Sequence, residues 1–144
     1  MKSDIILAGV GGQGVLSLAA IITRAAVNDD LTVRQSEVHG MAQRGGAVLA
    51  HLRIADGAIA SDLVPQGGAD MILSMEPVES LRYLAWLTRS GVLISAGEAY
   101  VNIPDYPDLE EIYAAIRRLP KHQLVETRKL AKQAGSSRAV NMVL

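Results

Sequence analysis

The stretch Asp4-Ile5-Ile6-Leu7-Ala8-Gly9-Val10-Gly11-Gly12-Gln13-Gly14-Val15-Leu16-Ser17 sets the architecture of this chain. A short apolar run comes first, four glycines follow within six residues, and an alanine-rich apolar segment comes next. That order predicts a buried strand at 5–8, a tight turn, and a helix at 13–28. The spacing Gly9-x-Gly11-x-x-Gly14 matches the glycine fingerprint of a nucleotide-binding strand–turn–helix unit.

Each glycine of this fingerprint has its own physical reason. Gly9 permits a sharp turn, Gly11 lets a ligand approach the backbone, and Gly14 lets the helix pack close to the strand. The free amide groups at the helix start, around Gly12 and Gln13, favour an anion. The same glycines could instead serve close strand–helix packing without any ligand, so the spacing alone leaves both interpretations open.

The remainder of the chain alternates apolar runs with helical patterns. The expected strands are 31–36, 47–54, 70–75, 92–96 and 123–127, and the expected helices are 77–89, 108–119 and 128–134. Asp56-Gly57 is a hairpin signal, so residues 58–60 are expected to return as a strand against 47–54. The sequence therefore predicts an α/β fold, a three-layer Rossmann-like domain whose mostly parallel sheet contains an inserted β-hairpin.

Composition narrows the possible functions. With 144 residues the chain is expected to form one domain, and its net charge of -1 argues against nucleic-acid binding. Cysteine is absent, which excludes disulfides, thiolate nucleophiles and cysteine-ligated iron–sulfur clusters. The three histidines are not at metal-ligand spacing, so no metal site is expected. The first apolar run is far shorter than the ~20 residues of a membrane span, and a soluble cytoplasmic protein is expected.

A second candidate site is the connection Glu37-Val38-His39-Gly40-Met41-Ala42-Gln43-Arg44-Gly45-Gly46. Glu37 lies roughly where dinucleotide-binding domains hold a ribose, although a bond to local backbone or to Arg44 is an equal alternative. His39 could donate a hydrogen bond, and Arg44 could hold a phosphate or carboxylate or form an interface ion pair. We expect Glu37, His39, Gln43 and Arg44 to contact the substrate or a partner chain.

Glu76 follows an apolar strand and precedes Pro77, at the edge of the sheet where open α/β folds bind ligands. It is either part of a site or a carboxylate favoured by a helix N-terminus, and the second interpretation is the simpler one. No serine has the context of a hydrolase nucleophile, so no catalytic residue is assigned. Lys129, Lys132 and Arg138 are expected to form a solvated face.

The two glycine-rich motifs, followed by Ser61-Asp62 and Glu76-Pro77, resemble the gamma-type domain of 2-oxoacid:ferredoxin (acceptor) oxidoreductases. Within that family the sequence is most similar to the small beta subunit of indolepyruvate ferredoxin oxidoreductase. The similarity covers essentially the entire chain. The apolar segment that begins at Val140 and stops at Leu144 predicts either an incomplete chain or an end that packs against a partner. The resemblance implies a single gamma-type domain over residues 1–144 that lacks its C-terminal part, because family members usually continue past the point that matches Leu144.

The resemblance implies an oxidoreductase subunit that is inactive alone. The holoenzyme oxidatively decarboxylates an arylpyruvate such as indolepyruvate, joins the acyl group to coenzyme A and passes electrons to ferredoxin. Thiamine diphosphate and iron–sulfur clusters would belong to a large partner subunit in a hetero-oligomer, and a homodimer is an option for the isolated chain. Gly9, Gly11, Gly12, Gln13 and Gly14 would bind coenzyme A phosphates or pack against the partner. The alternative is an independent Rossmann-type protein that binds NAD or FAD.

Overall fold

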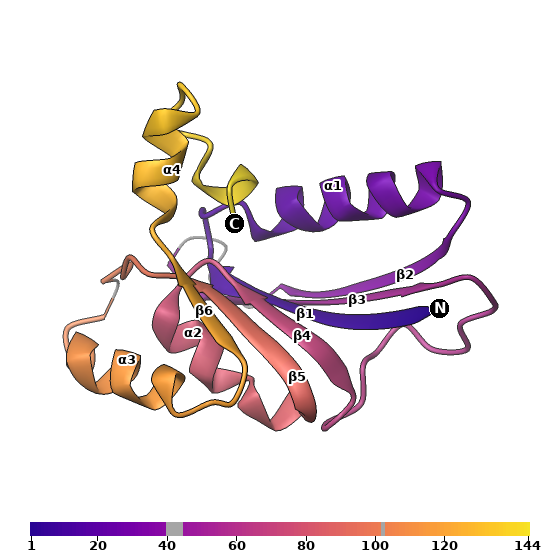
Figure 1. Cartoon of the computed structure of the whole chain (residues 1–144), viewed down its shortest axis with the longest axis horizontal. Coiled ribbons are helices and arrows are strands. Elements are labelled where there is room, and N and C mark those ends of the chain that lie inside the picture. The colour runs from indigo at the N-terminus through magenta and orange to yellow at the C-terminus, as the bar shows by residue number, and fades with distance from the viewer. Residues whose placement is uncertain (40–44, 102) are drawn as a thin grey trace.

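A mixed sheet forms the middle layer of the protein (Figure 1). The computed structural model describes residues 1–39, 45–101 and 103–144. Over these residues the sheet has six strands in the order β2-β3-β1-β4-β5-β6. The strands are β1 (Lys2–Val10), β2 (Thr32–His39), β3 (Ala47–Ala55), β4 (Ala69–Ser74), β5 (Leu87–Ala96) and β6 (His122–Val125). The helices are α1 (Val15–Asn28), α2 (Pro77–Arg82), α3 (Leu109–Arg117) and α4 (Thr127–Gln133), with 3-10 turns η1 (Leu84–Trp86) and η2 (Val140–Met142).

One strand runs against the others. β3 is antiparallel to β1 and to β2, whereas the pairs β1–β4, β4–β5 and β5–β6 are parallel. At the centre of the sheet, Ile6 of β1 faces His51 of β3 on one side and Ile72 of β4 on the other. The predicted α/β class with a largely parallel sheet is therefore confirmed.

The inserted hairpin exists, but its predicted position was wrong. β2 and β3 form the hairpin, with β3 paired to β2 along its whole length. Residues 58–60, predicted as the returning strand, are not in a strand. Because β3 already lies between β1 and β2, neither of its edges is free to accept another strand. The segment after β3 instead folds across Arg53, whose guanidinium donates to the carbonyls of Ser61 and Leu63, both at 3.1 Å.

The helix predicted over 77–89 is also too long. α2 ends at Arg82, a 3-10 turn follows, and Ser90-Gly91, expected to stop the helix, lies inside β5. A Cβ added to Gly91 would meet Leu87 Cδ1 at 2.6 Å and the carbonyl of Ala69 at 3.0 Å. Gly91 thus permits a close backbone approach next to an irregular pairing between β4 and β5.

Apolar side chains cover both faces of the sheet. Leu7 and Leu52 are fully buried on the side of α1, which packs on β1, β2 and β3. Ile6 and Ile72 are fully buried on the opposite side of the sheet, which α2 and α3 cover. Figure 1 shows α1, α4 and the C-terminus above the sheet and α2 and α3 below it. This arrangement is a three-layer sandwich with a mainly aliphatic core on each face of the sheet, and aromatic side chains such as Tyr83 join the core on the α2 side.

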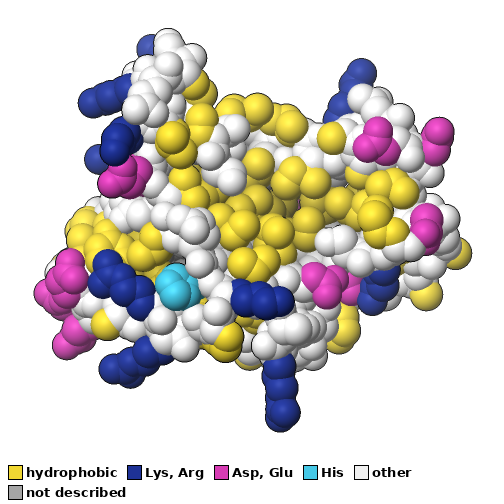
Figure 2. Space-filling view, in the orientation of Figure 1, with side chains coloured by type: hydrophobic (Ala, Val, Ile, Leu, Met, Phe, Trp, Pro, Cys, Tyr) yellow, Lys and Arg dark blue, Asp and Glu magenta, His cyan; other side chains and the backbone are white. Residues whose placement is uncertain are grey.

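The α1 side is less completely covered over the later strands. The side chains of Met71 on β4 and Ile94 on β5 pack against the α1-side core but remain partly exposed. Figure 2 shows hydrophobic side chains gathered across the middle of the molecule, below α1. Within the described part of the chain, no helix is both long and apolar enough to cross a membrane.

Candidate functional site

The glycine loop connects the carboxyl end of β1 to α1, and hydrogen bonds hold its shape. Gln13 Oε1 accepts from the amide of Val10 at 2.8 Å, and Gln13 Nε2 donates to the carbonyl of Met75 at 3.1 Å. The amide of Gly11 donates to the carbonyl of Gly46 at 2.8 Å. The Gln13 side chain is therefore a clamp that joins the loop to the end of β4.

The glycines of the loop serve two different purposes. A Cβ on Gly9 would lie 2.7 Å from Val15 Cγ2, and a Cβ on Gly14 would lie 2.6 Å from Asn141 Nδ2. A Cβ on Gly12 would meet nothing within 4 Å. Gly12 and Gly14 have φ angles of 101° and 84°, in the left-handed region that favours glycine. Gly9 and Gly14 thus allow close packing, whereas Gly12 faces open space.

That open space is a cavity of about 260 Å³ at the carboxyl ends of the parallel strands. Gly12 and Gln13 line one wall, and Met75 lines the floor beside β4. α1 leaves β1 toward one face of the sheet and α2 leaves β4 toward the other, so β1 and β4 form a topological switch point. Ligands of open α/β sheets bind in the crevice at such a point.

The segment after β5 and the start of α4 close the cavity. Glu98 lines it, and its carboxylate accepts from Thr127 Oγ1 and from the amide of Arg128, both at 2.8 Å. Arg128 and Arg138 also line the cavity. Because Glu98 caps α4, its charge is already engaged by the start of that helix, and the two arginines supply positive charge at the opening.

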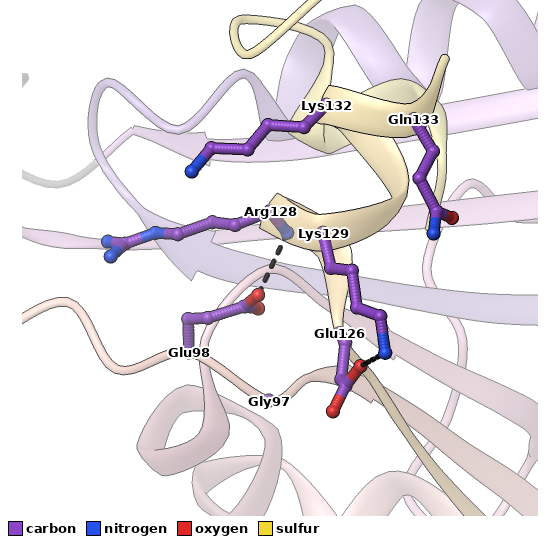
Figure 3. Close-up of a pocket in the computed structure, with 7 residues that line it drawn as sticks. All are labelled: Gly97, Glu98, Glu126, Arg128, Lys129, Lys132 and Gln133. Atoms are coloured by element: carbon purple, nitrogen blue, oxygen red, sulfur yellow. Dashed lines mark hydrogen bonds and ion pairs between the residues drawn. The ribbon is translucent and has the colours of Figure 1, made fainter.

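A second, wider cavity of about 610 Å³ adjoins the first along α4 (Figure 3). Within it, Lys129 Nζ pairs with Glu126 at 2.9 Å. Figure 3 shows the Arg128 and Lys132 side chains extending from α4 toward the same side. The sequence predicts a solvated face here, and these side chains are exposed, but they also border a concave surface. One sequence pattern could have indicated this concave surface. It is the set of basic residues in a helix that starts at the carboxyl end of a strand.

Glu76 lies at the same edge of the sheet but points away from this cavity, into the protein. It is 1% exposed, caps α2 by accepting from the amide of Glu79 at 2.9 Å, and also accepts from the amide of Tyr100 and the hydroxyl of Tyr106. Burial, and then the hydrogen bond to Glu76, raise the pKa of the Tyr106 phenol. The geometry matches the simpler interpretation of Glu76, that of a helix cap, and adds a link to Tyr100 and Tyr106.

The second glycine-rich motif is only partly placed. The Glu37 carboxylate accepts from Gln35 Nε2, and Gln35 Oε1 accepts from Thr23 Oγ1 at 3.0 Å. Gln43, Arg44 and the side chain of His39 lie outside the described residues. β3 separates β2 from β1, so Glu37 is not on the strand next to the glycine loop, unlike the ribose-binding carboxylate of a dinucleotide fold. Among the described residues, no three His, Asp or Glu side chains form a group that could hold a metal ion.

Comparison by sequence and by structure finds similarity to oxidoreductases that act with ferredoxin or flavodoxin and to their subunits. A family model described as pyruvate ferredoxin/flavodoxin oxidoreductase matches residues 4–144. The chain is 40% identical to indolepyruvate oxidoreductase subunit IorB of Archaeoglobus fulgidus, over 100% of this chain and 74% of that relative.

Solved structures share the fold. The gamma subunit of a keto/oxoacid ferredoxin oxidoreductase from Geobacter sulfurreducens aligns with a TM-score of 0.66 at 25% identity, over 99% of this chain and 71% of that chain. The 2-oxoglutarate:ferredoxin oxidoreductase of Magnetococcus marinus aligns with a TM-score of 0.70 at 17% identity. That alignment covers 98% of this chain but only 23% of the longer chain, and it shows a common fold.

Proposed function

The chain belongs to the pyruvate ferredoxin/flavodoxin oxidoreductase family, and from this we propose that it is the small subunit of an indolepyruvate-type 2-oxoacid oxidoreductase. The observation that carries the proposal is the 40% identity to an IorB subunit over the whole chain. In the proposed reaction an arylpyruvate loses carbon dioxide, its acyl group is joined to coenzyme A, and the electrons pass to ferredoxin. We place this complex in the cytoplasm.

We assign the redox cofactors to a large partner subunit. Iron–sulfur clusters are held by cysteine thiolates, and this sequence has no cysteine. Thiamine diphosphate, which supplies the carbanion stabilisation that decarboxylation needs, is assigned to the same partner. The small subunit is therefore expected to be inactive alone, and the working enzyme is a hetero-oligomer.

We further propose that the glycine-loop cavity binds coenzyme A. Gly12 leaves the loop backbone open to the cavity, and Arg128 and Arg138 offer charge-assisted donors for phosphate at its walls. The Gln13 clamp holds the loop in one shape before the ligand arrives, which reduces the ordering cost of binding. The role of this chain in the reaction is then to hold and orient the acyl acceptor.

Reconstitution tests the proposal. This chain is co-expressed with a large thiamine-binding subunit from the same organism, and reduction of ferredoxin or a dye is followed with indolepyruvate, phenylpyruvate, pyruvate and 2-oxoglutarate. We expect activity that depends on an arylpyruvate, on coenzyme A and on both subunits. Equal activity from the large subunit by itself would show that this chain is not part of the enzyme.

A further inference from the structure

Two cavities meet at the start of α4 and share two of their lining residues. Glu98 and Arg128 border both the 260 Å³ cavity at the glycine loop and the 610 Å³ cavity along α4. Arg138 borders only the inner cavity, together with Gly12, and Lys132 borders only the outer one. A ligand that lies along both cavities would therefore meet Arg138 first, Arg128 at the junction and Lys132 last.

The charges around this surface do not cancel. Glu98 is bonded to the first residues of α4, including Thr127 Oγ1 at 2.8 Å, and Glu126 is paired with Lys129 at 2.9 Å. Arg128, Lys132 and Arg138 form no ion pair with any residue that the structure describes. Three cations that border one concave surface repel each other, and an anion with several charges relieves that repulsion.

We infer that these three side chains form a phosphate subsite in two parts. Arg138, with the backbone around Gly12, holds a diphosphate at the inner cavity, while Arg128 and Lys132 hold a separate phosphate monoester at the outer cavity. This assignment rests on the proposed function, because coenzyme A carries a diphosphate and a 3′-phosphate on one nucleotide. Arginine suits the junction because its guanidinium presents several donors in a fixed plane.

The two parts of the subsite predict different responses to two ligands. Dephospho-coenzyme A lacks the 3′-phosphate but retains the diphosphate. In the reconstituted complex, Lys132→Gln should raise the KM for coenzyme A about tenfold, the loss expected for one hydrogen bond to a charged group. The same variant should leave the KM for dephospho-coenzyme A unchanged, whereas Arg138→Gln should raise the KM for both ligands. Neither variant should change kcat or the KM for the 2-oxoacid.

Arg24→Gln is the matched control, because Arg24 is an exposed arginine of α1 that lines neither cavity. It removes the same charge and should leave both KM values unchanged. The thermal unfolding midpoints of all variants should equal that of the wild type, since the substituted side chains are exposed and lack partners among the described residues.

The results separate the subsite from the proposed function. An active complex in which Lys132→Gln and Arg138→Gln leave the KM for coenzyme A unchanged would overturn the subsite and retain the function. An inactive wild-type complex would overturn the function. Equilibrium titration of that complex would then support the subsite if coenzyme A binds more tightly than dephospho-coenzyme A and Lys132→Gln abolishes the difference. Equal binding of the two ligands would overturn it.

Discussion

Asn141 and Gly14 are in contact although 127 positions separate them in the sequence. Asn141 Nδ2 donates to the carbonyl of Gly14 at 3.4 Å, which brings η2 against the start of α1 (Figure 1). The glycine loop is thus fixed by two side chains: Gln13, which belongs to the loop, and Asn141, which bonds to it from η2. Val140, the neighbour of Asn141, lines the inner cavity, so the last residues of the chain help to shape the candidate site.

Gly14→Ala should destabilise the protein by about 2 kcal/mol. An alanine at a φ angle of 84° is strained by ~1–2 kcal/mol, and its Cβ would displace the Asn141 amide. Urea unfolding measures the change. Gly12→Ala also places an alanine at a positive φ angle but in open space, so it lacks the clash with Asn141 and should cost less. Gly57→Ala has neither feature and should change stability by less than ~0.5 kcal/mol. Equal effects at Gly12 and Gly14 would show that the Asn141 contact contributes nothing.

Gln13→Met should also destabilise the protein, by about 1–3 kcal/mol, because it leaves the amide of Val10 without its acceptor. The side chain keeps a similar length, so the lost hydrogen bonds dominate the effect. Gln133→Met, on the exposed end of α4, is the control and should be neutral in the same urea titration. A neutral Gln13→Met would contradict the clamp.

Tyr106→Phe should lower stability by about 1–2 kcal/mol, because the buried Glu76 carboxylate loses its hydroxyl donor. Tyr100→Phe is the control, since only the backbone of Tyr100 bonds to Glu76 and its side chain is exposed. Alkaline titration gives a second measurement. The raised pKa of Tyr106 means that the folded state keeps this proton, so stability falls as pH rises above the ordinary tyrosine value of 10.0. Tyr106→Phe should reduce that loss.

His51 should make the protein less stable in mild acid. Burial lowers the pKa of His51, and its Nδ1 accepts from the amide of Val64 at 3.2 Å, which requires the neutral ring. The unfolded chain takes up a proton as pH falls below about 6.5, whereas the folded protein resists protonation until its lower pKa is reached. Stability is therefore full above pH 6.5 and declines below it.

His51→Gln tests this prediction, because glutamine can accept from Val64 but does not titrate. The difference in urea midpoint between about pH 7.5 and pH 5.5 should shrink in the variant. Titration of Asp4 does not contribute to the difference between these two pH values. Burial raises its pKa, but hydrogen bonds from Arg53 and Lys2 outweigh burial and hold the pKa below 3.8, so its contribution is lost only in stronger acid. An unchanged difference in the variant would contradict the assignment to His51.

Local features of the fold were predictable from sequence, and long-range pairing was not. The strand, turn and helix around Gly9–Gly14 follow from adjacent residues, as does Asp108 at the start of α3. The choice of partner for β3 depends on which strands reach it in three dimensions, and the Asp56-Gly57 signal suggested the wrong one. Gly91 was misread for a similar reason, because its close contact with β4 comes from residues far away in the chain.

The candidate site was predicted in part. Gly12 and Gln13 were expected to bind a ligand and do line a cavity, although the Gln13 side chain bonds to the backbone, and ligand binding there stays a prediction. Arg128 was not assigned to the site and Arg138 was expected on a solvated face, because both follow the glycine loop by more than a hundred residues and reach it only through the order of β4, β5 and β6. In a single sequence, basic residues that follow no repeating pattern do not indicate that they line the same cavity as a distant glycine loop.

The central position of β1 has a consequence for synthesis. β1 leaves the ribosome before the two strands that pair with it, yet Ile6, Leu7 and Ala8 have no exposed surface once the sheet is complete. The partners that enclose it end at Ala55 and Ser74, so the nascent chain carries an unpaired apolar strand until both have emerged. Such late, long-range pairing slows folding and exposes a strand edge to other chains. Chaperone binding to nascent chains that end before Ser74 is therefore expected to be strongest at the very segment that later holds the glycine loop.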